Sequence, residues 1–151
     1  MLQKYFPSGN AFRNVIRAVF FFLLSSPVYV NAQNYFFDSY GVAEGIAQST
    51  VYDILQDNND YIWLGTRAGI SRFDGTLFVN YTMEDNLAEN GVRVLYMDSS
   101  NNIWAGHSGG GISIYDGKKF RKFTAPGEVF SSDITSITPD RDGNIWVTSE
   151  L

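Results

Sequence analysis

Aspartates that recur at expected turns are the most obvious candidates for a binding site in this sequence. The segment Asp140–Asn144 (Asp-Arg-Asp-Gly-Asn) alternates oxygen ligands as the start of a calcium-binding loop does. An EF-hand also needs a bidentate glutamate at its twelfth position, which here is Leu151. The equivalent segments Asp57–Asp60 and Asp98–Asn101 share only the first aspartate. All three are therefore interpreted as hairpin turns, and no metal site is predicted.

Glycines and the single histidine offer two further chemistries. Gly109–Gly111 has the composition of a phosphate-binding loop, but such a loop precedes a helix, and the strand pattern Ile112–Tyr115 follows instead. His107 is the only histidine and cysteine is absent, so histidine dyads, histidine metal clusters, thiolate sites and disulfides are excluded within this chain. No catalytic residue and no cofactor are predicted.

Three side chains remain as candidate ligand-binding residues: Arg67, Arg93 and His107. Guanidinium and imidazole groups offer several hydrogen-bond donors to acidic or hydroxyl-rich ligands. The competing interpretation is that all three are solvated, with His107 a surface imidazole at the end of a strand. The choice depends on whether the fold brings them to one face.

The elements that must position these residues are copies of one repeat. Trp63, Trp104 and Trp146 lie 41 and 42 residues apart, and each follows an isoleucine. Six residues before each tryptophan is an aspartate; these are Asp57, Asp98 and Asp140. Phe-Asp-Gly at 73–75 is matched by Tyr-Asp-Gly at 115–117, and the apolar residues at 51, 54, 78 and 81 have counterparts in the second copy. The repeats extend over residues 45–87, 88–130 and 131–151, the last being incomplete.

Each complete repeat contains four predicted strands. In the first copy they span residues 51–56, 61–66, 70–73 and 77–81, and the breaks between them have turn chemistry. Asp74-Gly75 between apolar strands is the signal of a type I′ hairpin. Connections this short require antiparallel neighbours.

A four-stranded antiparallel unit that recurs every ~40–45 residues is the signature of a β-propeller blade. The predicted fold is therefore all-β, a β-propeller of four-stranded antiparallel blades, and residues 33–151 would form an incomplete arc of about two and a half blades. The tryptophan of each second strand is expected to pack between neighbouring blades. A twisted β-sandwich is the alternative, and the strict repetition argues against it.

The propeller fold places the candidate residues. Arg67 and His107 would share the face that carries the loops between blades, and Arg93 would begin the strand nearest the axis. Asn34–Tyr40 is similar in composition to the strand at 77–81. We expect it to form an outermost strand of the last blade in the intact ring.

Residues 1–32 have the pattern of a cleavable signal peptide. Basic residues without any acid precede the apolar run 18–24, and Val30 and Ala32 occupy the two recognition positions before a cut ahead of Gln33. The alternative, a retained membrane anchor, needs about 20 predominantly apolar residues, whereas this run is interrupted at 25–27. We therefore expect an exported, periplasmic product with no membrane span after residue 32.

The expected mature segment is strongly acidic. With three of the 11 basic residues in the segment 1–32, the rest of the chain sets 8 basic residues against 16 acidic ones. Such a surface repels phosphate backbones, so nucleic acid is not expected as a partner.

The composite repeat pattern resembles the two-component regulator propeller repeat. It reads Val-x-x-Ile-x-x-Asp, Ile-Trp-x-Gly-Thr, Gly-Ile-x-x-Phe-Asp-Gly and Phe-x-x-Tyr, and the resemblance covers residues 34–151. It implies an N-terminal fragment of the periplasmic sensor region of a bacterial hybrid sensor histidine kinase. It also implies further blades, a membrane helix and a kinase on the same chain, and an oligosaccharide or other small ligand. After Trp146 the third repeat departs from the pattern, because Thr148-Ser149 stands where the family has Gly-Thr.

The sequence therefore favours a ligand-sensing propeller region that performs no catalysis itself. An exported propeller scaffold that binds a protein or a polysaccharide is the alternative. A secreted propeller lyase or glycosidase is a third reading, and it would need convergent acids or a histidine base in the central channel. The coding sequence beyond Leu151 would separate the first two readings.

Overall fold

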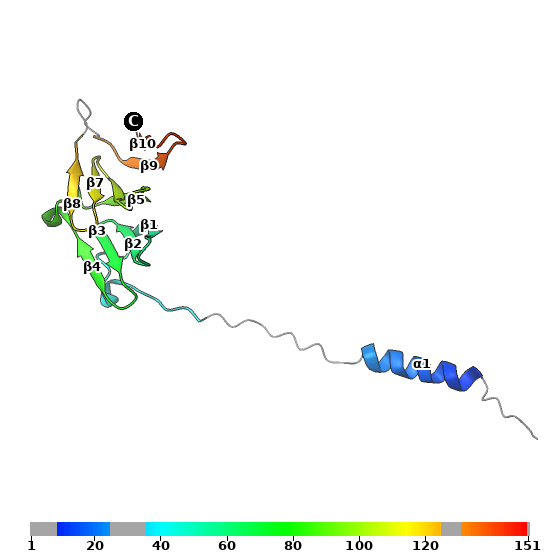
Figure 1. The fold of residues 1–151 in the computed structure, drawn as a ribbon. Helices are drawn as coiled ribbons and strands as arrows, with labels where there is room; N and C mark the ends of the chain where they lie inside the picture. Colours follow the sequence, from blue (N-terminus) through cyan, green and yellow to red (C-terminus); the bar gives the residue numbers. More distant parts are fainter. Residues whose placement is uncertain (1–8, 25–35, 125–130, 151) are drawn as a thin grey trace, which may run out of the picture. The chain divides into compact units, whose positions relative to one another are not determined.

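The computed structural model describes residues 9–24, 36–124 and 131–150, and it divides into two units, Met1–Phe37 and Asp38–Leu151 (Figure 1). In the first unit, α1 (Gly9–Leu24) contains the apolar run of the predicted signal peptide. Among the described helices, none combines the length and the hydropathy that a membrane crossing requires. The predicted cleavage position after Ala32 lies outside the described residues.

The second unit consists of antiparallel blades, as the repeat predicted. The first blade is a sheet in the order β1-β2-β3-β4, formed by β1 (Val51–Gln56), β2 (Ile62–Thr66), β3 (Gly69–Phe73) and β4 (Phe78–Tyr81). The second blade has the same order, with β5 (Val92–Met97), β6 (Ile103–His107), β7 (Ile112–Tyr115) and β8 (Phe120–Phe123). The third repeat contributes the hairpin of β9 (Ile134–Pro139) and β10 (Ile145–Ser149). The all-β blade architecture is confirmed.

Two short 3-10 helices precede the blades and were not predicted from the sequence. They are η1 (Val42–Glu44) and η2 (Met83–Asp85), and they lie 41 residues apart as the rest of the repeat does. Gly45 and Asn86 end them with φ of 114° and 69°, in the left-handed region that reverses the chain. η2 therefore turns the chain from the outer strand β4 toward β5, and η1 has the equivalent position ahead of β1.

The first strands of the three repeats lie beside one another. β5 contacts both β1 and β9, whereas β4 and β8 are the outer strands of their sheets (Figure 1). This is the arrangement of propeller blades, in which the first strand of each blade lies nearest the axis.

Two apolar clusters hold neighbouring repeats together. The larger lies between the first two blades and contains Trp63, which is 1% exposed, with Tyr115 and Phe120 of the second blade. The smaller is formed by Ile112, Ile114, Ile134 and Ile137, with Trp104 packed against it. The expected packing of a second-strand tryptophan between blades is confirmed for Trp63, while Trp146 is 66% exposed.

Glycine in the Trp-x-Gly motif permits close contact between blades. A Cβ added at Gly106 would lie 2.5 Å from Cγ2 of Ile134 and 2.7 Å from Cγ1 of Val94. A Cβ at Gly65 would lie 3.1 Å from Val92. The motif glycine is therefore needed because the next repeat packs directly on the second strand.

The segment predicted as an outermost strand is only partly described. Residues 34 and 35 lie outside the described residues, and residues 36–40 form no strand. Instead, the ring of Tyr40 lies 5.0 Å from that of Phe73 and 5.9 Å from that of Phe78. Aromatic contact with the first blade thus takes the place of strand pairing.

Candidate functional site

The repeated aspartates are structural parts of the blade. Oδ2 of Asp57 accepts a hydrogen bond from the indole Nε1 of Trp63 at 2.8 Å, and the same bond joins Asp98 to Trp104 at 2.8 Å and Asp140 to Trp146 at 3.0 Å. The other carboxylate oxygen accepts two backbone N–H groups from the turn that follows. The predicted hairpin turns are thereby explained: each aspartate organises the turn and fixes the tryptophan.

The donors lower the pKa of one of these carboxyls markedly. The side chains of Asn144 and Trp146 donate to Asp140 and bring its pKa down from 3.8 to about 2. At Asp98 burial acts in the opposite direction, but hydrogen bonds from Trp104 and Asn102 lower its pKa overall. Within residues 9–24, 36–124 and 131–150, no cluster of three or more acidic or histidine side chains is placed to hold a metal ion.

A hollow of about 310 Å³ lies where the first two blades meet. It is lined by Tyr52 from β1, Arg67 from the β2–β3 turn, Glu89 and Gly91 from the connection between the blades, and Ser108 from the β6–β7 turn. We name it the inter-blade hollow. It lies on the face to which the sequence assigned the inter-blade loops and the β2–β3 turns.

One backbone hydrogen bond, repeated in each unit, builds this face. The residue after the second strand donates to the residue before the first: Arg67 N to Thr50 O at 3.2 Å, Ser108 N to Gly91 O at 2.8 Å, and Glu150 N to Asp133 O at 2.9 Å. The turn and the inter-blade connection are therefore held together in every repeat. At Gly91 the approach is close, since a Cβ there would lie 3.0 Å from Cβ of Ser108.

Of the three predicted ligand-binding residues, Arg67 lines the hollow directly. Its side chain is exposed, and its guanidinium makes no ion pair or hydrogen bond with the described residues. A guanidinium in this position is available to a bound ligand.

Arg93 lies beside the hollow but is already engaged. Its Nη1 is 3.0 Å from Oδ2 of Asp133 and its Nη2 is 3.8 Å from Oε1 of Glu150. Its guanidinium carbon also lies 5.5 Å from the centre of the Tyr52 ring. Arg93 therefore connects the tyrosine of the hollow to two carboxylates of the third repeat.

His107 differs from the surface imidazole that the sequence led us to expect. It is fully buried, with Nε2 at 2.8 Å from Oγ of Ser113, and no group among the described residues makes a hydrogen bond of good geometry with its Nδ1. Burial lowers the pKa of His107 from 6.5 to about 4, against the opposite effect of the backbone groups of Gly91 and Glu89. The first blade has Thr66 at this position, which is also fully buried. His107 is thus a neutral core residue behind the hollow and does not line it.

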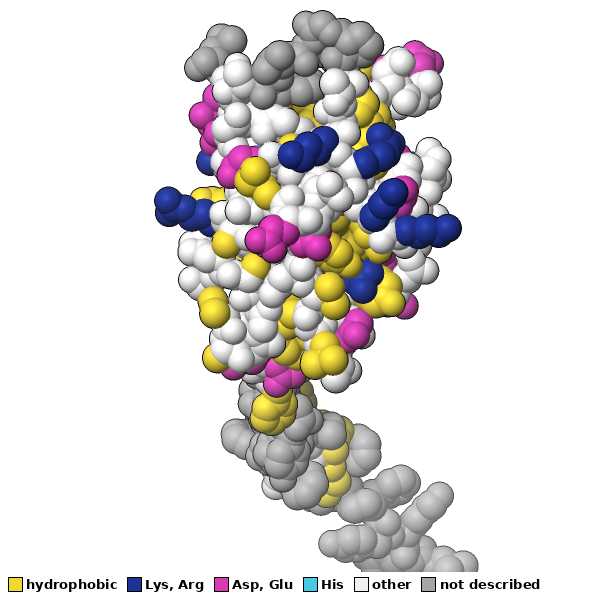
Figure 2. Space-filling model, turned by 90° about the vertical axis from the view of Figure 1, so that its left-hand side faces the viewer, with side chains coloured by type: hydrophobic (Ala, Val, Ile, Leu, Met, Phe, Trp, Pro, Cys, Tyr) yellow, Lys and Arg dark blue, Asp and Glu magenta, His cyan; other side chains and the backbone are white. Residues whose placement is uncertain are grey.

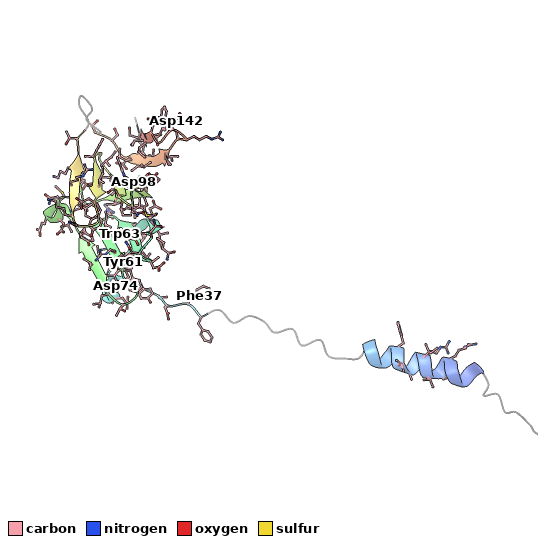
Figure 3. All side chains as sticks on the ribbon, in the orientation of Figure 1. Phe37, Tyr61, Trp63, Asp74, Asp98 and Asp142 are labelled. Atoms are coloured by element: carbon pink, nitrogen blue, oxygen red, sulfur yellow. The ribbon has the colours of Figure 1, made fainter. Side chains whose placement is uncertain are left out.

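Four lining residues were not identified as site residues from the sequence: Tyr52, Glu89, Gly91 and Ser108. Ser108 had a usable signal, because it lies one repeat of 41 residues after Arg67. Tyr52 and Glu89 had none, because the hollow forms only when two blades are placed side by side. Figure 3 shows Trp63 within the first blade, with Asp98 and Asp142 in the β5–β6 and β9–β10 turns of the following repeats.

Comparisons with known proteins agree with this arrangement. The model of the two component regulator propeller family matches residues 45–68 and 128–150. Over 67 residues the chain is 36% identical to "Histidine kinase P4" of Formosa agariphila, which covers 44% of this chain and 5% of that protein. The fold is similar, with a TM-score of 0.62 and 24% identity, to the extracellular domain of a putative hybrid two component system from B. thetaiotaomicron, over 73% of this chain and 16% of that one.

The chain thus spans about one twentieth of the curated relative and about one sixth of the solved structure. Each matched segment contains one aspartate–tryptophan hydrogen bond of the repeat. Residues 45–68 contain β1 and β2 with the Asp57–Trp63 bond. Residues 128–150 contain the β9–β10 hairpin with the Asp140–Trp146 bond. In its repeats, its blades and these matched segments, the chain is similar to the two component regulator propeller family.

Proposed function

We propose that residues 38–151 belong to the exported, ligand-sensing propeller region of a two-component sensor histidine kinase, and that the inter-blade hollow binds an oligosaccharide. The observation that carries this proposal is the composition of the hollow. It combines an aromatic ring, an unpaired guanidinium, a carboxylate and a hydroxyl at the junction of two blades.

These groups suit a sugar. The exposed ring of Tyr52 offers an apolar face for a pyranose ring, while Arg67, Glu89 and Ser108 supply donors and acceptors for hydroxyl groups. Because no carboxylate of the described residues forms an ion pair with Arg67, an acidic sugar would gain a charge-assisted hydrogen bond. The predicted ligand class therefore includes uronate-containing oligosaccharides.

Arg93 gives the hollow a connection to the rest of the ring. It contacts Tyr52 on one side and Asp133 and Glu150 of the third repeat on the other. A ligand that moves the Tyr52 ring would therefore alter the ion pairs that hold the third repeat. This is a physical route by which binding would change how neighbouring blades pack.

No catalysis is proposed for this segment. The resemblance to "Histidine kinase P4" and to an extracellular domain supports export and a kinase elsewhere on the parent chain. An exported scaffold that binds a polysaccharide without signalling would use the same hollow. The two functions differ in whether a membrane helix and a kinase follow on the same chain.

The test is a calorimetric binding measurement with the parent protein and a panel of short neutral and uronate-containing oligosaccharides. Arg67→Gln should weaken binding of the acidic members about tenfold, because it removes one charge-assisted contact. Arg141→Gln, which removes an exposed arginine outside the hollow, is the matched control and should bind as the wild type does. Equal affinity of all three proteins for every bound sugar would place the ligand elsewhere.

A further inference from the structure

Half of the basic residues in the acidic propeller segment fall within five positions of the β7–β8 hairpin. They are Lys118, Lys119, Arg121 and Lys122, which we name the basic rim. All four are exposed, and none forms an ion pair with the described residues. The carboxylate of the same turn, Asp116, accepts the backbone N–H groups of Lys118 and Lys119 at 3.0 Å. Figure 2, which looks onto the side of the outer strands, shows lysine and arginine side chains gathered in a band across this face.

The first blade shows that the fold does not require these charges. The equivalent positions of its β3–β4 hairpin are Thr76, Leu77, Val79 and Asn80, 42 residues earlier. Its turn has the same construction, with Asp74 accepting the N–H groups of Thr76 and Leu77 at 2.8 Å. Lysine on an outer strand also protects against edge-to-edge pairing. The outer strand β4 has no such protection, so edge protection alone does not account for four charges on β8 and its turn.

Two adjoining hollows run along the basic rim. One, of about 250 Å³, reaches from Lys118 to Tyr81, and the other, of about 360 Å³, is lined by Arg121 and Lys122. They share Asn86, Lys119 and Phe120, so they form one continuous depression. The first hollow is also lined by the carboxylates of Glu84 and Asp85. The second hollow is lined by Lys119, Arg121 and Lys122 and by no carboxylate, so it is the part of the depression that suits an anionic chain of linked rings.

From this arrangement we infer that the basic rim binds an anionic polysaccharide through its sulfate or carboxylate groups. Residues two apart on a strand lie about 6–7 Å apart, so Lys119 and Arg121 present their charges in a row that suits an extended polyanion. A membrane fits less well, because Phe120 is buried and the rim offers no exposed apolar side chain to insert between lipids. The rim is a surface separate from the inter-blade hollow and shares no lining residue with it.

The experiment measures binding of the purified parent protein to dextran sulfate, polygalacturonate and uncharged dextran at physiological salt. Wild-type protein should bind both anionic polymers, with affinity that falls as salt rises, and should not bind dextran. The triple variant Lys119→Gln/Arg121→Gln/Lys122→Gln should bind at least about tenfold more weakly, since three screened ion pairs are lost. Its oligosaccharide binding at the inter-blade hollow should be unchanged.

The matched control lowers the net charge by the same amount at exposed turn positions elsewhere, with Asn59→Asp/Ser99→Asp/Ser100→Asp. It should retain polymer binding. Equal losses in the two triple variants would show that net charge alone is responsible and would overturn the inference. Binding to anionic phosphatidylglycerol vesicles without binding to either polymer would also overturn the inference. So would a rim variant that aggregates while its polymer binding is unchanged, because the basic residues would then serve to protect the strand edge.

Discussion

The indole Nε1 of Trp63 donates a hydrogen bond of 2.8 Å to Oδ2 of Asp57, across the turn that joins the first two strands of the blade. Trp63 is almost fully buried between blades, so its polar N–H needs a partner there. Asp57 meets that need while its other oxygen accepts the N–H groups of Asn59 and Tyr61. With the tryptophan six residues after the aspartate, one carboxylate can accept hydrogen bonds from both the turn N–H groups and the indole N–H.

Replacement of Asp57 by alanine should therefore destabilise the propeller unit more than loss of an ordinary turn residue. Asp57→Ala leaves a buried indole N–H and two turn N–H groups without acceptors, with an expected cost of about 1–3 kcal/mol. Urea unfolding followed by tryptophan fluorescence measures it. The control is Asp142→Ala in an exposed turn, which should change stability by less than about 0.5 kcal/mol. Similar costs for the two variants would contradict the role assigned to Asp57.

The buried histidine predicts a specific pH dependence of stability. The pKa of His107 is about 4 in the folded chain, against 6.5 for an unperturbed side chain. Between these values the unfolded chain binds a proton and the folded chain does not, so stability is full above pH 6.5 and falls as the pH drops toward 4. The shift corresponds to about 3 kcal/mol.

The measurement is the free energy of unfolding at several pH values for wild type and His107→Gln. The variant should lose the part of the slope between pH 4 and 6.5 that belongs to the histidine, whatever its absolute stability. Parallel curves for the two proteins over that range would mean that His107 titrates normally in the folded state.

The repeat was readable from the sequence because its markers have strong local causes. Asp74-Gly75 and Asp57 sit at turns, and Trp63 follows at fixed spacing, so strands and blades could be placed to within about a residue or two. The hydrogen bond between Asp57 and Trp63 was not predicted, because a spacing that recurs in each repeat does not show which atoms of the two residues are in contact. His107 was misplaced because β6 is covered on both faces, so alternation of polar and apolar residues carries no information there.

The inter-blade hollow was only partly predictable for a different reason. Arg67 was found because turns between strands two and three must share one face of a propeller. Tyr52 and Glu89 belong to different blades, and their meeting depends on how one blade packs on the next. The engagement of Arg93 by Asp133 and Glu150 is likewise a contact between repeats, which spacing within one repeat does not reveal.

Packing between repeats leads to a prediction about the motif glycine. Gly106→Ala would bring a methyl group within 2.5 Å of Ile134 and 2.7 Å of Val94, so the second and third repeats would have to separate. We expect a loss of about 1–3 kcal/mol in unfolding free energy, as for other overpacked cores. Thr148→Ala, at the equivalent exposed position of the third repeat, is the control and should be nearly neutral. Equal stability of wild type and Gly106→Ala would show that the space between Gly106, Val94 and Ile134 can hold a methyl group.

The final prediction concerns an isolated polypeptide of residues 33–151. In the structure Trp146 is 66% exposed, and among the described strands β10 pairs with β9 alone. An unpaired strand edge beside exposed apolar surface favours association with another chain. Repeat arrays also gain much of their stability from contacts between neighbouring repeats, which the third repeat makes on one side here. This polypeptide should therefore unfold with low cooperativity, bind a hydrophobic dye and form oligomers as its concentration rises.

Sedimentation velocity over a range of concentrations, together with thermal unfolding, measures this behaviour. A direct control is Trp146→Ser, which removes the exposed indole without touching the contacts between the first two blades. It should reduce dye binding and association while leaving the fluorescence of buried Trp63 unchanged. Addition of further repeats after Leu151 should suppress association in the wild-type sequence by covering β10. A monomer that unfolds in a sharp thermal transition at every concentration tested would show that the two blades and the β9–β10 hairpin are stable without a further repeat packed against β10.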